Sequence, residues 1–318
     1  MGLIRYIKNQ FRHDRNTKWL IRANATSIAN LSREQKRDRR IDWLKDKVMT
    51  CTEPGITDER YSGEEVIVSL TSFGNRIYEV YLAIESIMQG TLKPNRILLW
   101  LSKDEFRGKI LPRTLQFQQK RGLEICFCED IRSYKKILPT MKQFRDACVV
   151  TIDDDLMYEF DLLESLLRAH IDDPESVCAC RMHRITMDEH KMPKSYLDWD
   201  FMINPENRSN YHFLTSGGGT LFPPHCFVDE FYNQEAFMTL CPFADDIWIN
   251  AMILLSGRHI SKVYTHSKDG CDYLEIRLDQ DDALSKENVH PSRCRNDVQF
   301  KAVCDRYDLY EFWKQQEE

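Results

Sequence analysis

The chain contains 11 cysteines among its 318 residues, but no Cys-x-x-Cys pair. Zinc-binding domains usually place their cysteines at such short fixed spacings, and disulfide frameworks of secreted proteins use an even number of cysteines. The odd count without these spacings argues against both classes. It favours reduced thiols, as in a cytosolic protein.

Long apolar runs are also missing. No stretch of about 18 apolar residues occurs, so the sequence predicts no membrane-spanning helix. The basic start lacks the apolar segment of a signal peptide. Tyr6 stands where a myristoylation signal needs Ser or Thr. We therefore expect a cytoplasmic protein.

Acidic residues are scarce in the first part of the chain. Residues 1–50 carry 13 Lys+Arg against 5 Asp+Glu, whereas the remainder carries 31 against 45. A basic arm on an acidic body does not fit a general nucleic-acid binder, but it fits an arm that touches an anionic surface. Residues 1–48 have a weakly amphipathic helical pattern. This pattern fits a peripheral contact with the inner face of the plasma membrane, or a helical pair packed on the body or on a protein partner.

The rest of the chain alternates apolar strands with amphipathic helices, which predicts parallel βαβ units in an α/β sheet with helices on both faces. Pro139 either kinks the third helix or marks its start. Residues 171–212 look irregular. The expected strands are 66–70, 96–101, 123–128 and 148–152, and the expected helices are 76–89, 111–121, 135–146, 162–170, 244–256 and 296–314. The expected divisions are a helical extension with its linker over 1–62, a nucleotide-binding domain over 63–275 and a helical tail over 276–318.

The most informative segment runs from Cys148 to Asp155, where a buried strand ends in three carboxylates. Like charges at Asp153, Asp154 and Asp155 repel one another, and carboxylates are rarely buried unless they are paired or bind a cation. In open α/β sheets, ligands bind beyond the carboxyl ends of the strands. We interpret the segment as a site where a divalent metal holds a phosphorylated ligand. The alternative is a strand that stops at a solvated acidic turn.

Two other predicted strands end in polar residues at the same edge. Thr71 and Arg76 follow the first strand, where a hydroxyl lets a ligand approach and a guanidinium can bind phosphate. Asp130 follows the third strand and can receive a nucleobase edge, and Lys136 can place a point charge near a diphosphate. Each residue alone is more often a helix cap or a solvated charge. Their coincidence at one edge carries the argument.

The second half offers weaker candidates. The run Gly217 to Gly219 lacks the Lys-Ser/Thr of a phosphate loop, so it either brings the backbone close to a sugar or is a flexible turn. Asp245 and Asp246 open a helix, where acids stabilise the helix or act as a general base. His266 and His290 are candidates for a third metal ligand, although most single histidines are not ligands.

Taken together, these residues resemble bacterial GT-A-type, family-two-like glycosyltransferases of capsule and lipopolysaccharide synthesis. The resemblance covers about residues 64–260 and 296–307. No single segment is specific, but the ordered set is. The segments are Val68-Ser69-Leu70-Thr71-Ser72 with Arg76, Lys93-Pro94, Ile97-Leu98-Leu99-Trp100-Leu101-Ser102, Tyr134-Lys135-Lys136, Ile152-Asp153-Asp154-Asp155 with Tyr158, Gly217-Gly218-Gly219 and Ala244-Asp245-Asp246-Ile247-Trp248.

The resemblance implies a Rossmann-like GT-A sheet and a Mn²⁺ or Mg²⁺ ion that holds the diphosphate of a nucleotide-sugar. Asp153 and Asp155 then match the DxD-like metal ligands, with His266 as the candidate third, and Asp154 faces the sugar or ribose. The remaining residues expected around the nucleotide-sugar are Thr71, Arg76, Asp130, Lys136, Gly218 and Gly219.

The implied reaction moves a sugar from a UDP-sugar to a hydroxyl of a glycan or lipid-linked glycan, with inversion and with Asp246 or Asp245 as the base. Ala244 replaces an acid that related enzymes often carry, so the choice between the two aspartates stays open. An aspartyl phosphatase or phosphotransferase is one alternative, although Met157 stands where such enzymes have Thr or Val. A catalytically silent nucleotide-sugar-binding module is the other.

Overall fold

The chain forms two compact units, Met1–Asp46 and Lys47–Glu318. The expected N-terminal helix is present over residues 30–50. No helix among the described residues has both the length and the apolar character needed to cross a bilayer. The computed structural model describes residues 30–205, 209–266, 273–277, 288–289 and 294–314.

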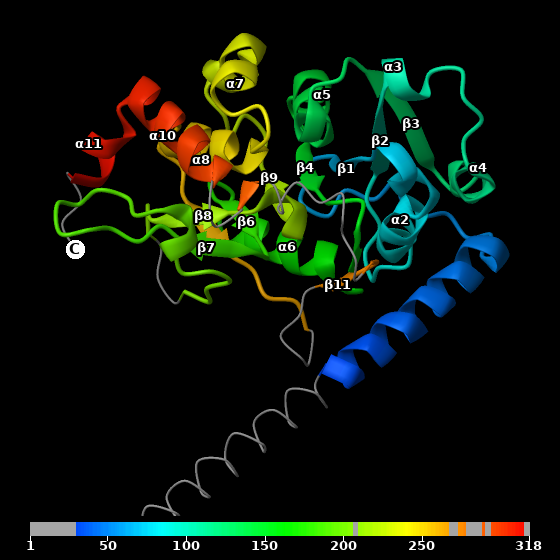
Figure 1. Cartoon of the computed structure of the whole chain (residues 1–318). Helices are drawn as coiled ribbons and strands as arrows, with labels where there is room; N and C mark the ends of the chain where they lie inside the picture. Colours follow the sequence, from blue (N-terminus) through cyan, green and yellow to red (C-terminus); the bar gives the residue numbers. More distant parts are fainter. Residues whose placement is uncertain (1–29, 206–208, 267–272, 278–287, 290–293, 315–318) are drawn as a thin grey trace, which may run out of the picture. The chain divides into compact units, whose positions relative to one another are not determined.

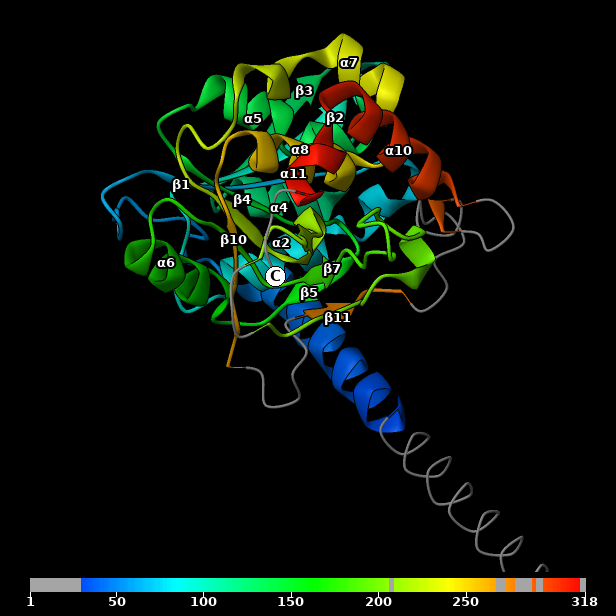
Figure 2. The same ribbon diagram turned by 90° about the vertical axis from the view of Figure 1, so that its left-hand side faces the viewer.

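A seven-stranded sheet forms the centre of the second unit, in the order β10-β6-β9-β4-β1-β2-β3 (Figures 1 and 2). The predicted α/β fold with a mostly parallel sheet is confirmed. One strand departs from it, because β9 runs antiparallel to both β4 and β6. The strands are β1 (Val66–Thr71), β2 (Arg96–Ser102), β3 (Leu123–Cys128), β4 (Cys148–Thr151), β6 (Val177–Ala179), β9 (Thr220–Phe222) and β10 (Ile260–Lys262).

Two short antiparallel pairs accompany the main sheet: β5 (Leu156–Tyr158) with β11 (Tyr273–Glu275), and β7 (Met182–Arg184) with β8 (His212–Leu214). The α-helices are α2 (Val80–Met88), α3 (Lys103–Phe106), α4 (Arg113–Gln119), α5 (Leu138–Gln143), α6 (Leu162–Asp172), α7 (Gln234–Leu240), α8 (Asp245–Leu255), α10 (Arg295–Tyr307) and α11 (Leu309–Lys314). The 3₁₀ helices are η1 (Gly74–Tyr78), η2 (Arg132–Lys136), η3 (Tyr196–Asp198), η4 (Ser216–Gly218) and η5 (Asp229–Tyr232).

The side chains of β1 alternate between two buried faces of the sheet, as in a parallel sheet that helices cover on both sides. Val66, Val68 and Leu70 belong to a core that also contains buried residues of α2, α4 and α6. Ile67 packs on the other face with Trp100. Helices on both faces, as expected, therefore shield the strands from water.

A second core joins α8 to the C-terminal helices α10 and α11, which lie beside it in Figure 2. Trp248 of α8 is fully buried there with Val303 of α10 and Trp313 of α11. The indole Nε1 of Trp248 donates to the carbonyl oxygen of Phe231 at 3.0 Å. Residues 295–314, expected as part of a tail, thus share a hydrophobic core with the sheet unit.

Several helices differ from their expected bounds. α5 begins at Leu138 with Pro139 in its first turn, which confirms that this proline marks a helix start. The expected helix over 296–314 is divided at Asp308, whose φ of +53° breaks the helical path. The stretch 171–212, expected as irregular, contains β6, β7 and η3.

The order of the strands reverses at β1. From β1 the chain builds β2 and β3 on one side, and then crosses to β4 on the other side of β1. In sheets of this kind, ligands bind in the crevice at the carboxyl ends of the two strands where the order reverses. Ser72 follows β1 and Asp153 follows β4, so both lie at this edge.

Candidate functional site

Two of the three aspartates after β4 contact residues that follow β1. Arg76 of η1 donates from Nη1 to Asp154 Oδ1 and to Asp155 Oδ2, both at 2.9 Å. The hydroxyl of Ser72 donates to the other oxygen of Asp154 at 2.6 Å. The sequence therefore predicted correctly that Arg76 and the acidic turn share one edge of the sheet, and the structure adds Ser72.

Lys136 connects the acidic turn to the second half of the chain. Its Nζ donates to Asp153 Oδ1 at 2.9 Å and lies 3.1 Å from Asp245 Oδ2 at the start of α8. The side chain is only 7% exposed, so these contacts are shielded from solvent. The two candidate groups of aspartates, almost a hundred residues apart in sequence, are thus parts of one site. We call Asp153, Asp154, Asp155, Asp245 and Asp246 the acidic cluster.

Arg181, just after β6, is a residue of the site that the sequence interpretation missed. Its Nη2 lies 3.9 Å from Asp153 Oδ2. The guanidinium also donates to the hydroxyl of Thr215, and to that of Tyr273 at 3.2 Å. Its polar partners explain why an arginine is tolerated with its side chain 21% exposed.

The glycine run fits closely against this cluster. A Cβ on Gly217 would overlap the carboxylate of Asp153, and a Cβ on Gly218 would overlap the side chain of Arg181. Gly219 has a φ of +94°, which L-residues rarely adopt. Tyr158 ties the run to the acidic turn, because its hydroxyl accepts from the backbone N–H of Asp153 and donates to the carbonyl of Gly217. The run is a buried, fixed turn, and its contact with a sugar stays a prediction.

Asp246 is held by the residue before the glycines. Its Oδ1 accepts from the backbone N–H of Ser216 at 2.9 Å and from the Ser216 hydroxyl at 2.6 Å. Burial and the charge of Asp245 raise the pKa of Asp246 to about 6, although Lys136 and Ser216 oppose the shift. A carboxylate with such a pKa changes its protonation state close to neutral pH, as a general base requires.

The aspartates of the turn respond differently to the same crowding. Burial raises the pKa of Asp154 to about 6, despite the opposing charge of Arg76. Burial and the charge of Asp153 also raise the pKa of Asp155. Burial acts in the same direction on Asp153, but Lys136 and Arg181 outweigh it and hold its pKa below the ordinary value.

The charges of the site do not balance among its described residues. Five carboxylates face three cations, namely Arg76, Lys136 and Arg181. When all five acids are ionised, two negative charges remain, which equals the charge that a divalent cation neutralises. Oxygen ligands of this kind suit Mg²⁺ or Mn²⁺.

The acidic cluster does not form a closed metal cage. Among the described residues, a group of three other side chains brings its ligand atoms within 4.8 Å of one another. These are Glu64, Cys148 and His170. This group lies elsewhere in the unit. Because Mg²⁺ in phosphate-binding sites often takes only one or two carboxylates and completes its shell with phosphates and water, Asp153 and Asp155 still fit such an ion.

Three predicted residues have partners outside the acidic cluster. The hydroxyl of Thr71 donates to the carbonyl of Trp100 at 2.8 Å. Asp130 pairs with Lys135 and, although burial opposes it, this lysine holds the pKa of Asp130 below its ordinary value. His266 is exposed, and its Nδ1 lies 2.5 Å from Asp161 Oδ2. His266 therefore contacts Asp161 and not the acidic cluster. The other candidate histidine, His290, lies outside the described residues.

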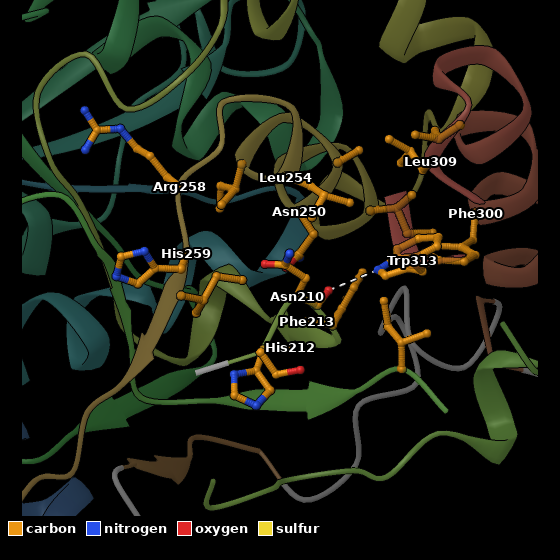
Figure 3. A pocket seen from close by; sticks show the side chains of 17 residues that line it. Asn210, His212, Phe213, Asn250, Leu254, Arg258, His259, Phe300, Leu309 and Trp313 are labelled. Carbon is orange, nitrogen blue, oxygen red and sulfur yellow. Dashed lines mark hydrogen bonds between the residues drawn. The ribbon is translucent and has the colours of Figure 1, made fainter. Parts of the chain in front are cut away.

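A small, mostly apolar cavity lies between α8, β8, α10 and α11 (Figure 3). Trp313 closes one side and donates from Nε1 to the carbonyl of Asn210 at 3.1 Å. Asn250 lines the cavity and also donates to the carbonyl of Asp246, one turn earlier in α8. None of the lining residues belongs to the acidic cluster, so the cavity is not the predicted nucleotide site.

No protein-family model and no curated protein matches the chain. A solved structure of CMP:2-keto-3-deoxy-manno-octonic acid synthetase with CTP is 12% identical, covers 62% of this chain and 88% of its own, and has a TM-score of 0.35. HddC from Yersinia pseudotuberculosis is 13% identical, covers 51% and 77%, and has a TM-score of 0.32. The chemistry of this chain therefore has to be inferred from its own residues.

Proposed function

We propose that the chain is a metal-dependent glycosyltransferase that moves a sugar from a UDP-sugar to a hydroxyl of a glycan or lipid-linked glycan. The observation that carries this proposal is the acidic cluster, where five carboxylates from two halves of the chain meet three cations at the reversal point of the sheet. A divalent ion together with a diphosphate suits this mixture of charges. The carboxylates attract the ion, and the cations attract the phosphates.

Asp153 and Asp155 are the residues that would hold Mn²⁺ or Mg²⁺. Such an ion, when bound, supplies Lewis-acid stabilisation for the negative charge of a departing diphosphate. Lys136 and Arg181 contribute fixed positive charge beside Asp153. When a diphosphate binds, a phosphate oxygen can replace the Asp153 carboxylate as the partner of these cations. Arg76 anchors Asp154 and Asp155, so that these carboxylates are oriented before the donor arrives.

Asp246 is the better candidate for the base. Asp245 is committed to an ion pair with Lys136, whereas the pKa of Asp246 is raised to about 6. Ser216 fixes the orientation of the Asp246 carboxylate through two hydrogen bonds to Oδ1. In an inverting transfer, Asp246 takes the proton of the acceptor hydroxyl while that oxygen attacks the anomeric carbon from the side opposite the diphosphate. Asp245 then serves to position Lys136.

The most direct test measures UDP release while UDP-sugars are screened with Mn²⁺ and with Mg²⁺. We expect slow hydrolysis of one donor without acceptor, and loss of at least a hundredfold in rate for Asp155→Asn. Asp146→Asn is the matched control, because Asp146 is exposed and pairs only with His225 among the described residues.

Other outcomes would favour the alternative functions. Release of phosphate from simple phosphoesters, without UDP release, would support a phosphatase or phosphotransferase. Binding of UDP and Mn²⁺ without turnover of any donor would support a silent nucleotide-sugar-binding module. Either result would overturn the transferase assignment.

A further inference from the structure

A second group of ligating side chains lies at the opposite edge of the sheet. β1 and β4 are parallel and pair Val66 with Cys148, so their first residues share one edge and the acidic turn lies at the other. Glu64 precedes β1, Cys148 opens β4, and the backbone N–H of Cys148 donates to the carbonyl of Glu65 at 2.8 Å. His170 reaches the same place from the last turn of α6.

Two ligand atoms of this group already have the spacing of a metal centre, and the third lies near them. The Sγ of Cys148 lies 3.4 Å from the Nε2 of His170, and a carboxylate oxygen of Glu64 joins them within 4.8 Å. In a tetrahedral zinc site, with bonds of about 2.3 Å to sulfur and about 2.0 Å to nitrogen, the two ligand atoms are roughly 3.5 Å apart. An ion therefore fits between them with little movement of the side chains.

The polar atoms of the group are poorly satisfied without an ion. Cys148 and His170 are 0% and 3% exposed. Among the described residues, Glu64 Oε2 is a buried atom without a hydrogen-bond partner, and the 3.4 Å hydrogen bond between Cys148 Sγ and His170 Nε2 is the contact that an ion would replace. Buried polar atoms of this kind are costly, and a bound ion or water is one way to satisfy them.

We propose that Glu64, Cys148 and His170 bind a zinc ion that fastens α6 to the starts of β1 and β4. A thiolate and an imidazole select a borderline-soft metal over Mg²⁺ or Mn²⁺, so this site differs in metal from the acidic cluster. The fourth ligand of the ion is water. The site does not depend on the proposed transferase activity, because it lies at the edge of the sheet away from the acidic cluster.

Binding requires a proton balance. Burial raises the pKa of the Cys148 thiol to about 12, so the free thiol keeps its proton at neutral pH. The zinc ion takes the place of this proton on sulfur, and the proton leaves to solvent. No oxidation or reduction takes place.

Cobalt gives the most specific readout, because a thiolate-to-cobalt charge-transfer band reports a Co–S bond. Chelator-treated full-length protein is titrated with Co²⁺ and then with Zn²⁺ in the background variant Asp155→Asn, which weakens binding at the acidic cluster. We expect one equivalent of Co²⁺ to produce the band and Zn²⁺ to abolish it. Cys148→Ser should remove the band, and Glu64→Gln should weaken zinc affinity at least tenfold.

Two controls keep the test independent of folding. Cys226→Ser, at another buried cysteine, should keep the band. Glu64 is only half-buried, so Glu64→Gln should fold normally, which far-ultraviolet circular dichroism of the chelated protein would check. The proposal is overturned if the parent protein gives no band with Co²⁺, or if Cys148→Ser keeps it. UDP release in Mn²⁺ should persist when Cys148→Ser is made alone, without Asp155→Asn, which separates this site from the proposed function.

Discussion

The ammonium group of Lys136 lies 2.9 Å from the carboxylate of Asp153 and is almost fully buried. This ion pair joins the 3₁₀ helix after β3 to the turn after β4. We expect Lys136→Gln to lower the rate of UDP release roughly a hundredfold, because it removes a fixed positive charge from the place where the leaving diphosphate develops charge. Lys103→Gln removes an exposed pair with Glu129 and should leave the rate unchanged. A Lys136→Gln enzyme with a rate within twofold of the parent would exclude a role for this lysine.

The activity should depend on the protonation of Asp246. Burial and Asp245 raise its pKa to about 6, so the carboxyl is protonated below that pH and cannot accept a proton. We expect kcat/KM to rise at least tenfold per pH unit below pH 6, because Asp154, whose pKa is also about 6, ionises over the same range, and to level off above it. Profiles of the parent protein and of Asp146→Asn should coincide. A rate that does not change between pH 5 and pH 8 would contradict Asp246 as the base.

The same aspartate should lower the stability of the fold at neutral pH. A carboxyl whose pKa is higher in the folded than in the unfolded chain binds its proton more tightly when folded, so stability falls as the pH rises from about 4 to about 6. Asp246→Asn removes this penalty, and its amide oxygen can still accept from Ser216. We expect the variant to be inactive but more stable at pH 7, by about 1–3 kcal/mol in denaturant unfolding. Equal or lower stability would show that other groups in the folded protein offset the cost of burying the ionised Asp246 carboxylate.

Gly217 should be needed for its lack of a side chain. In Gly217→Ala the new Cβ would displace the carboxylate of Asp153, so we expect binding of Mn²⁺ and UDP, measured by calorimetry, to fall at least tenfold. Gly108→Ala is the control, because Gly108 lies in a turn, faces open space and has a φ of +80°. That change should cost about 1 kcal/mol of stability and leave binding intact. Normal binding by Gly217→Ala would show that Asp153 is not a ligand.

The basic start of the chain should bind anionic membranes. Residues 1–29 carry 6 Lys+Arg against one acidic residue. Each basic residue near an anionic surface contributes about 1 kcal/mol of attraction. Leu44 and Val48 are buried, so removing residues 1–29 should disturb the fold less than removing residues 1–48. The truncated protein should lose salt-sensitive binding to phosphatidylserine vesicles and retain UDP release. Equal binding by both proteins would reject the membrane contact.

The first half of the sheet could be predicted because its strands are continuous apolar runs separated by helices. Val66 to Leu70 and Ile97 to Leu101 are buried on both faces, and such runs have a clear signature in sequence. The direction of β9 could not be predicted. Its three residues, Thr220 to Phe222, are too few to reveal direction, and an apolar run has the same pattern whichever way it crosses a sheet.

The site was predicted in part for a similar reason. Arg76, Lys136 and the aspartates stand beside strand or helix ends that the sequence reveals, and they meet as expected. Arg181 follows a three-residue strand within a stretch that looked irregular. Its partners Thr215 and Tyr273 are distant in sequence, so only tertiary structure brings them together. An arginine directly after the apolar residues 177–180 was the available signal.

The pairing of β4 with β9 has a consequence for how the protein tolerates change. Thr151 is opposite Thr220, and the hydroxyl of Thr151 donates to the carbonyl of Ser216 at 2.8 Å. A slip of a single position between these two strands would turn every side chain of β9 to the other face. The slip would also move Ser216, which orients Asp246, away from the Asp246 carboxylate. Deletions or insertions within residues 215–219 should therefore be far more damaging than in the surface loop at 107–111, although both segments connect elements of the same sheet unit.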